Sequence, residues 1–108
     1  MVFAKLDDVL KAIEEKIGFS GGVMITEIQG HGKQKGLVQQ WRGDQYRVNL
    51  LTKIKLEIVV KDVEVDKIKA AIVSAAKTGE IGDGKIFTYN INDVLRIRTG
   101  ETGGSAIG

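Results

Sequence analysis

Apolar residues recur at helical spacing in two separate stretches of the chain. The first stretch comprises Leu6, Val9, Leu10, Ile13 and Ile17, and the second comprises Val65, Ile68, Ala71, Ile72 and Ala75. Residues three and four positions apart lie on one face of an α-helix, so both stretches predict amphipathic helices. Gly18 is a natural end for the first helix, and the second is expected to end near Lys77.

Alternating apolar and polar residues predict strands in four other segments, which are residues 23–29, 54–60, 85–90 and 94–98. Side chains of a strand point alternately to its two faces, so this pattern is typical of a half-buried sheet. The order helix, strand, strand, helix, strand, short strand predicts an α+β sandwich, with helices on one face of a mainly antiparallel sheet. A split βαβ arrangement would need one more strand ahead of the first helix, where the chain offers only a few residues.

Composition narrows the class of protein. The chain of 108 residues is expected to form one domain over residues 1–108, with ordinary apolar (43%) and charged (28%) content. The lack of cysteine excludes disulfides and thiolate metal sites, and the single histidine, His31, argues against a multi-histidine metal site. The sequence shows no membrane-spanning apolar run and no signal peptide. A net charge of +2 and 6% aromatic residues give weak support for nucleic-acid binding.

The stretch from Thr78 to Lys85, which we call the glycine loop, has the chemistry of an anion site. Three of its residues are glycine, and a lysine follows them at once. Glycine reaches positive φ without a Cβ clash, so such a loop can turn several backbone N–H groups toward one phosphate. Arg96 and Arg98 are expected on one face of a strand and would add two guanidinium groups. The alternative is an ordinary tight turn beside a solvated basic strand, with Asp83 present for backbone geometry.

Residues 30–49 show no sustained period and carry several polar and basic side chains. We interpret them as a long connection between two strands, and long loops in compact domains are usually functional or mobile. Taken alone, Lys33 and Lys35 are explained by a solvated basic loop. Trp41 suits either an interface anchor or a side chain that folds back onto its own subunit. His31 has no partners that would make it part of a catalytic triad.

Several longer motifs occur in order along nearly the whole chain. They are Leu6-Asp7-Asp8-Val9, Thr26 to Gly36, Arg42 to Tyr46, Lys53 to Val60, Thr78 to Phe87 and Arg96 to Glu101. Together they resemble the PII nitrogen-regulatory signal-transduction proteins. Because separate motifs match at sensible spacing, the resemblance is far more specific than one glycine signature.

The resemblance implies a ferredoxin-like βαββαβ sandwich, here with its usual first strand missing, assembled as a homotrimer. It implies ATP or ADP in clefts between subunits, with 2-oxoglutarate joining through Mg²⁺ and ATP. The family does not work as a catalyst but binds partner proteins, among them ammonium transporters and enzymes or regulators of nitrogen assimilation. Partners are expected to contact the T-loop, about residues 31–49. The B-loop covers about residues 77–85, and a tail of about residues 99–108 is expected to be flexible at its end.

The location implied by the resemblance is the cytoplasm, with membrane association only through a transporter and with no nucleic-acid partner. The family's functional positions transfer residue by residue. Nucleotide binding is implied for Gly30, Gly32, Lys33, Gln34, Glu57, Val59, Thr78, Gly82, Asp83, Gly84, Lys85, Arg96 and Arg98. Binding of 2-oxoglutarate is implied for Gly32, Gln34, Lys35, Gly36 and Lys53. Gln34 is also the implied protein ligand of Mg²⁺, which prefers oxygen donors. Tyr46 matches a position that some bacterial members nucleotidylate, although an unmodified loop tyrosine is the simpler interpretation.

Some positions depart from the family pattern. His31 stands for an aromatic residue, Lys33 for arginine, Met24 for threonine, Trp41 for tyrosine and Thr52 for proline. At Lys33 the change removes the bidentate geometry that arginine offers to phosphate. Two alternatives therefore stay open: a divergent nucleotide-binding regulator that does not sense 2-oxoglutarate, and an enzyme for a phosphorylated substrate. The enzyme is disfavoured because clustered carboxylates, a cysteine nucleophile and a Ser–His arrangement are all lacking. An RNA-binding domain would want exposed aromatics on strand 54–60, which has none.

Overall fold

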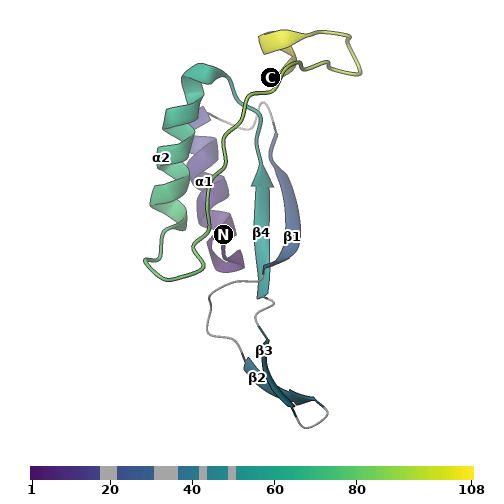
Figure 1. The fold of residues 1–108 in the computed structure, drawn as a ribbon. Helices are drawn as coiled ribbons and strands as arrows, with labels where there is room; N and C mark the ends of the chain where they lie inside the picture. Colours follow the sequence, from purple (N-terminus) through teal and green to yellow (C-terminus); the bar gives the residue numbers. More distant parts are fainter. Residues whose placement is uncertain (18–21, 31–36, 42–43, 49–50) are drawn as a thin grey trace.

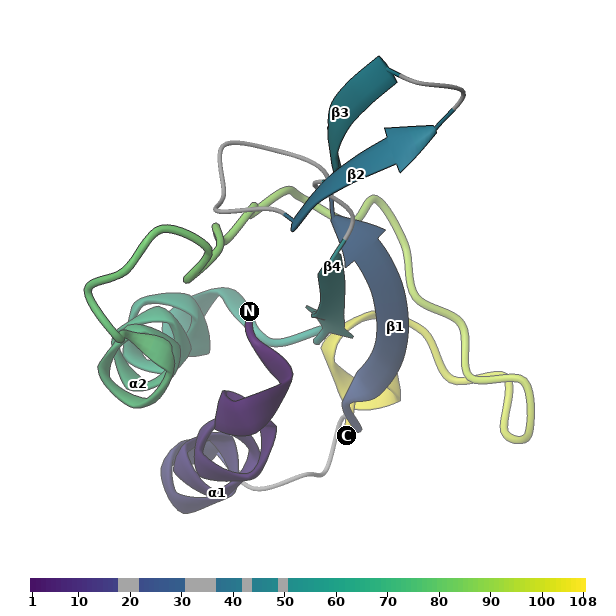
Figure 2. The same ribbon diagram turned by 90° about the horizontal axis from the view of Figure 1, so that it is seen from below.

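The computed structural model of the chain describes residues 1–17, 22–30, 37–41, 44–48 and 51–108. Two helices, α1 (Leu6–Ile17) and α2 (Val65–Ala76), cover one face of an antiparallel pair of strands, β1 (Met24–Gly30) and β4 (Leu51–Glu57). Seen from below, the helices form one layer and the strands the other (Figure 2). The predicted α+β sandwich is confirmed.

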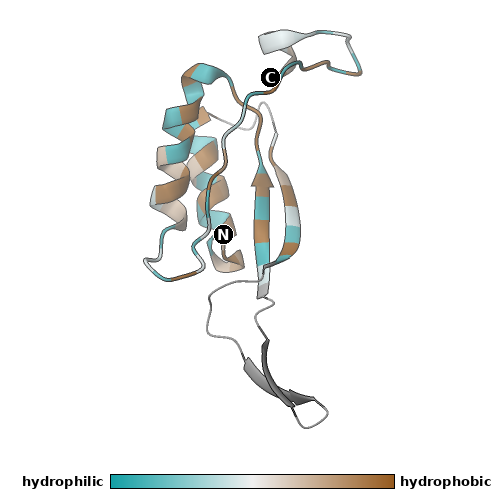
Figure 3. Ribbon diagram, viewed as in Figure 1, coloured by the Kyte–Doolittle hydropathy of each residue, from teal (hydrophilic) through white to brown (hydrophobic). Residues whose placement is uncertain are grey.

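Both helices form where the apolar spacing predicted them. Short 3₁₀ turns, Phe3–Lys5 and Asp62–Glu64, lead into α1 and α2 respectively. Acidic residues occupy the first turn of α1 and Lys16 its last turn, which suits the helix dipole. The core lies where the two helices meet, and its buried members are Val9, Ile13, Ile68 and Ala76. Apolar and polar residues alternate along the helices and strands of this sandwich (Figure 3), as a two-layer fold with one buried face requires.

Strands β1 and β4 pair from Met24 opposite Glu57 to Gly30 opposite Leu51. The predicted strand at 54–60 therefore begins earlier than expected and ends at Glu57. Ile54 is buried, so the side of β4 that carries it faces the helices. This pairing places the ends of β1 and β4 that carry the long insertion at the lower end of the sandwich (Figure 1).

The connection predicted as irregular contains a hairpin of its own. Strand β2 (Leu37–Trp41) pairs with β3 (Asp44–Val48), with Leu37 opposite Val48 and Trp41 opposite Asp44. The hairpin projects away from the two layers (Figure 1). Valine, tryptophan and tyrosine favour strands, and a hairpin satisfies its own backbone hydrogen bonds without the periodic pattern that burial against a core would impose. The absence of a sustained period therefore did not exclude strands.

The two strands predicted after α2 are wrong. Residues 85–94 form no regular element, and Leu95 makes only an isolated bridge with Thr102. A strand needs a neighbouring strand, and the outer edge of β4 is bonded by Met1, whose amine donates to the Ile54 carbonyl (3.1 Å) and whose carbonyl accepts from the Ile54 N–H (3.0 Å). This exchange of two bonds is that of one antiparallel residue pair.

The end of the chain differs from the flexible tail that was expected. Gly103–Ala106 forms a 3₁₀ turn, and Ala106 is buried. The guanidinium of Arg96 donates to the carbonyl of Ser105 (3.2 Å), which ties this turn to the preceding segment. A side-chain bond of this kind leaves no mark in local sequence composition, where glycine and serine indicate a mobile end.

Candidate functional site

The glycine loop closes around the carboxylate of Asp83. One carboxylate oxygen accepts the backbone N–H groups of Thr78 (2.8 Å) and Gly79 (2.9 Å), and the other accepts the Thr78 hydroxyl. The hydrogen bonds from Thr78 hold the pKa of Asp83 below its ordinary value. Gly79 and Gly82 have φ of 86° and 107°, a region that residues with a Cβ rarely enter. Asp83 therefore serves backbone geometry, as the sequence suggested.

The loop keeps backbone donors for an outside anion. The N–H groups of Thr78 and Gly79 already hold a carboxylate, so this backbone favours negative charge. Within the part of the chain that the structure describes, the N–H groups of Gly82, Gly84 and Lys85 make no hydrogen bond. Lys85 is an exposed residue. The second half of the loop is therefore the half whose backbone donors are open among the described residues.

A lysine from the sheet reaches the same loop. Lys53, which lies opposite Ile28 in the β1–β4 ladder, donates from Nζ to the carbonyl of Gly82 at 3.2 Å. Burial lowers the pKa of the Met1 amine, and the neighbouring charge of Lys53 lowers it further. A Cβ built on Gly84 would lie 3.1 Å from the Met1 nitrogen, so Met1 is also beside the loop. The structure thus brings the residue implied for 2-oxoglutarate together with the loop implied for the nucleotide.

The paired arginines do not lie on one strand face. Arg96 directs Nη1 to the Glu101 carboxylate at 3.0 Å, and its backbone N–H donates to the Glu101 carbonyl at 2.8 Å. Arg98 lies in the turn between them and is exposed. The strand-face prediction is wrong because, among the described residues, this segment has the isolated bridge from Leu95 to Thr102 in place of a ladder. Sequence reasoning also missed Glu101 as the partner of Arg96; the glycine at position 100 was the available signal for a turn that brings the two together.

The residues predicted to bind the nucleotide fall into two groups, which lie at opposite ends of the sandwich within one subunit. The glycine loop follows the lower end of α2, near the end of the sandwich that carries the insertion (Figure 1). Glu57 ends β4 at the upper end, where it pairs with Lys55 at 3.3 Å, and Val59 lies two residues further along the chain. Residues 96–108 also lie at the upper end (Figure 1). A single chain therefore does not assemble the cradle of lysine, loop and paired arginines.

Several predicted site residues lie outside the described part of the chain: Gly32, Lys33, Gln34, Lys35 and Gly36. Gly30 is described as the last residue of β1, opposite Leu51, and Tyr46 lies opposite Gln39 in the β2–β3 ladder. Among the described residues, no group of three or more His, Cys, Asp or Glu side chains could hold a metal ion. The described helices are too short or too polar to cross a membrane.

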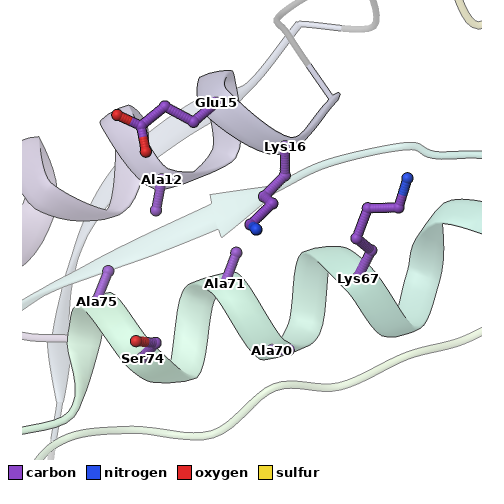
Figure 4. A pocket seen from close by; sticks show the side chains of 8 residues that line it. All are labelled: Ala12, Glu15, Lys16, Lys67, Ala70, Ala71, Ser74 and Ala75. Carbon is purple, nitrogen blue, oxygen red and sulfur yellow. The ribbon is translucent and has the colours of Figure 1, made fainter.

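A shallow depression of about 420 Å³ lies between α1 and α2 (Figure 4). Half of its eight lining residues are alanine, including Ala12, Ala71 and Ala75, and Lys16 and Lys67 also line it. None of the predicted site residues line it. Small side chains at the helix contact account for the hollow, and the glycine loop remains the candidate functional site.

The fold and the loop together define the class of the protein: a small ferredoxin-like α+β domain with a glycine-rich loop after its second helix and a projecting hairpin. The family model described as "Nitrogen regulatory protein P-II" matches residues 3–101. The chain therefore belongs to the P-II family, and its role is nitrogen-regulatory signalling.

Known relatives agree with this placement. The chain is 50% identical over 103 residues to the nitrogen regulatory protein P-II of Rhodospirillum rubrum, covering 95% of this chain and 90% of the relative. It is 48% identical over 103 residues to the nitrogen regulatory protein P-II 1 of Escherichia coli K12, with the same coverage of 95% and 90%. The solved structure of Arabidopsis thaliana PII bound to citrate matches with a TM-score of 0.74 at 36% identity, covering 98% of this chain and 82% of that one. The predicted ferredoxin-like PII fold is confirmed.

Proposed function

We propose that this chain senses ATP or ADP together with 2-oxoglutarate and passes the result to partner proteins. The observation that carries nucleotide sensing is the glycine loop. Its first half is closed by Asp83, while the N–H groups of Gly82, Gly84 and Lys85 make no hydrogen bond with the described residues, and the Lys53 ammonium contacts the Gly82 carbonyl. Backbone donors and one cation suit a phosphate chain. The Asp83 carboxylate is engaged by the Thr78 and Gly79 N–H groups and the Thr78 hydroxyl, so the output that we propose is binding rather than catalysis.

The complete site needs two copies of the chain. The glycine loop and the segment with Arg96 and Arg98 lie at opposite ends of one subunit (Figure 1), so the loop of one subunit would face the arginines of the next. Large apolar side chains from the end of the glycine loop to the arginine segment are exposed, among them Phe87 at 79% and, between the two arginines, Ile97 at 96%. Exposure of this extent marks a surface that association covers. We propose the homotrimer that the family resemblance implies.

Coupling between the two ligands follows from Lys53. Its ammonium lies 3.2 Å from a carbonyl of the glycine loop, where it would pair with a carboxylate of 2-oxoglutarate. Mg²⁺ would be held by the amide oxygen of Gln34 together with phosphate oxygens, a donor set that suits this ion. When bound, the ion links the phosphates and the dicarboxylate electrostatically. Each ligand should then strengthen the other by the same factor. Gly30, Gly32, Lys33, Lys35 and Gly36 would line the base of this site.

The projecting hairpin is the proposed contact with partners. Strands β2 and β3 extend away from the sandwich (Figure 1), where an ammonium transporter or a nitrogen-assimilation enzyme or regulator could bind them. Tyr46 lies in β3 and is the proposed position for modification. The setting is the cytoplasm, and the chain would reach a membrane only through a transporter.

Calorimetry tests the sensing directly. ATP is titrated into the protein with Mg²⁺ alone, with 2-oxoglutarate alone and with both. We expect 2-oxoglutarate to tighten ATP binding by about 5- to 150-fold, the usual range of site coupling, and only when Mg²⁺ is present. Binding of ATP without any response to 2-oxoglutarate would instead indicate the divergent nucleotide-binding regulator.

Two matched measurements test the site itself. Lys85→Ala should weaken ATP binding far more than Lys69→Ala, since Lys69 is an exposed lysine on α2, outside the B-loop. Equal effects would remove the glycine loop from the site. Light scattering should return a trimer, because a monomer would leave the loop and the arginines apart.

A further inference from the structure

Hydrogen bonds within the glycine loop give it its shape, whereas a hydrogen bond from the sheet sets its position. Its internal bonds join Thr78 and Gly79 to Asp83, which are at most five residues apart. Such bonds fix the shape of the loop and leave its position relative to the sheet undetermined. Among the side-chain hydrogen bonds of the described residues, all others span nine positions or fewer, whereas the bond from Lys53 to Gly82 spans 29.

Lys53 is well suited to act as an anchor. Its backbone lies in the β1–β4 ladder opposite Ile28, and the next residue, Ile54, exchanges two backbone bonds with Met1 on the other edge of the strand. The strand is therefore bonded on both edges at this point, and Ile54 is buried. A side chain based on so constrained a strand can hold the loop in place.

We propose that Lys53 positions the glycine loop for the nucleotide, in addition to any contact with a dicarboxylate. This inference rests on the proposed nucleotide-sensing function. A lysine ammonium has three donors, and the Gly82 carbonyl uses one of them. The remaining donors can serve a carboxylate while the loop stays held. The Nζ atom of Lys53 would then contact both the dicarboxylate and the glycine loop, so that no conformational change would be needed to couple the two ligands.

The consequence separates this proposal from a simple ligand contact. A lysine that only binds the dicarboxylate matters to ATP only when the dicarboxylate is present. A lysine that positions the loop matters to ATP alone. Lys53→Met tests this, because methionine keeps most of the length of the side chain and lacks both the donors and the charge. Lys69→Met is the matched control, because Lys69 is exposed on α2.

The first measurement uses the protein without nucleotide. The amide of Asp83 belongs to the same peptide group as the Gly82 carbonyl, so its NMR resonance reports the bond from Lys53. We expect Lys53→Met to shift this resonance and Lys69→Met to leave it in place. An unchanged Asp83 resonance in Lys53→Met would overturn the proposal.

The second measurement is ATP calorimetry with no dicarboxylate present. Lys53→Met should bind ATP about tenfold more weakly, the net effect of about one hydrogen bond. The loss should persist at high salt, because a purely coulombic loss would be screened there. Unchanged ATP affinity with only the 2-oxoglutarate response lost would overturn the inference and leave the proposed function standing. If the wild-type protein bound no ATP, the proposed function would fail, while the Asp83 resonance would still decide whether Lys53 places the loop.

Discussion

Ile13 is the residue at which the cost of disturbing the helical layer can be worked out from the structure. Its side chain is 0% exposed and lies in the core cluster with Val9 and Ile68. Ile13→Ala removes three buried carbon groups, worth about 0.8 kcal/mol each, or about 2.4 kcal/mol together. The cavity left behind raises the expected loss into the range of about 2–5 kcal/mol. Domains of this kind are stable by only about 5–15 kcal/mol, so the loss is a large share of the total.

Urea denaturation followed by circular dichroism measures this loss. All variants must be compared at one protein concentration, because assembly contributes to apparent stability. Ile13→Val should cost about 0.5–1.5 kcal/mol, since one methyl group is removed. Val73→Ala is the control on α2, where the side chain is 51% exposed, and should cost much less than Ile13→Ala. Equal losses for Ile13→Ala and Val73→Ala would refute the placement of the core between the helices.

Two further predictions concern the glycine loop. The lowered pKa of Asp83 means that its ionised form favours the closed loop, so closure is complete above the ordinary value of 3.8 and is lost as pH falls through the lower value in the folded protein. The Thr78 and Gly79 amide resonances should therefore titrate with a midpoint below 3.8, and Asp83→Asn should abolish that titration. Gly84→Ala should weaken ATP binding, because φ is +102° and the new Cβ would lie 3.1 Å from the Met1 nitrogen. Gly104→Ala, with open space and no such φ, should bind ATP like the wild type, and equal affinities in both variants would contradict the loop geometry.

The parts of the fold that sequence predicted well are those whose information is local. Helices α1 and α2 follow from apolar residues three and four apart, because one helical face meets one neighbour. Strand β4 follows from alternation, because it buries Ile54 against those helices. Strand β1 follows from the same kind of pattern, although its residues 24–29 are exposed and it is held by its pairing with β4. Asp83 was assigned to backbone geometry from the Gly-Asp-Gly pattern alone, and its bonds to Thr78 and Gly79 agree.

The failures share one cause, which is dependence on a partner elsewhere in space. Residues 85–90 have strand-like alternation, but a strand requires a neighbour, and among the described residues this segment pairs with no strand. Arg96 was assigned to a strand face for the same reason and instead pairs with Glu101 across a turn. The hairpin of β2 and β3 was missed because it is not packed on the core that imposes a period.

By itself, then, the sequence determined the α+β class, the two helices, the central pair of strands and, through its motifs, the P-II family. Only the tertiary structure decided that Lys53 reaches Gly82 from the sheet, and that the glycine loop and the arginine segment lie at opposite ends of one chain. Periodicity reports which face of an element is buried. It carries no information on which side chain, 29 positions away, will donate to a given carbonyl. That hydrogen bond depends on how the sheet and the helices pack, because packing brings distant residues such as Lys53 and Gly82 together.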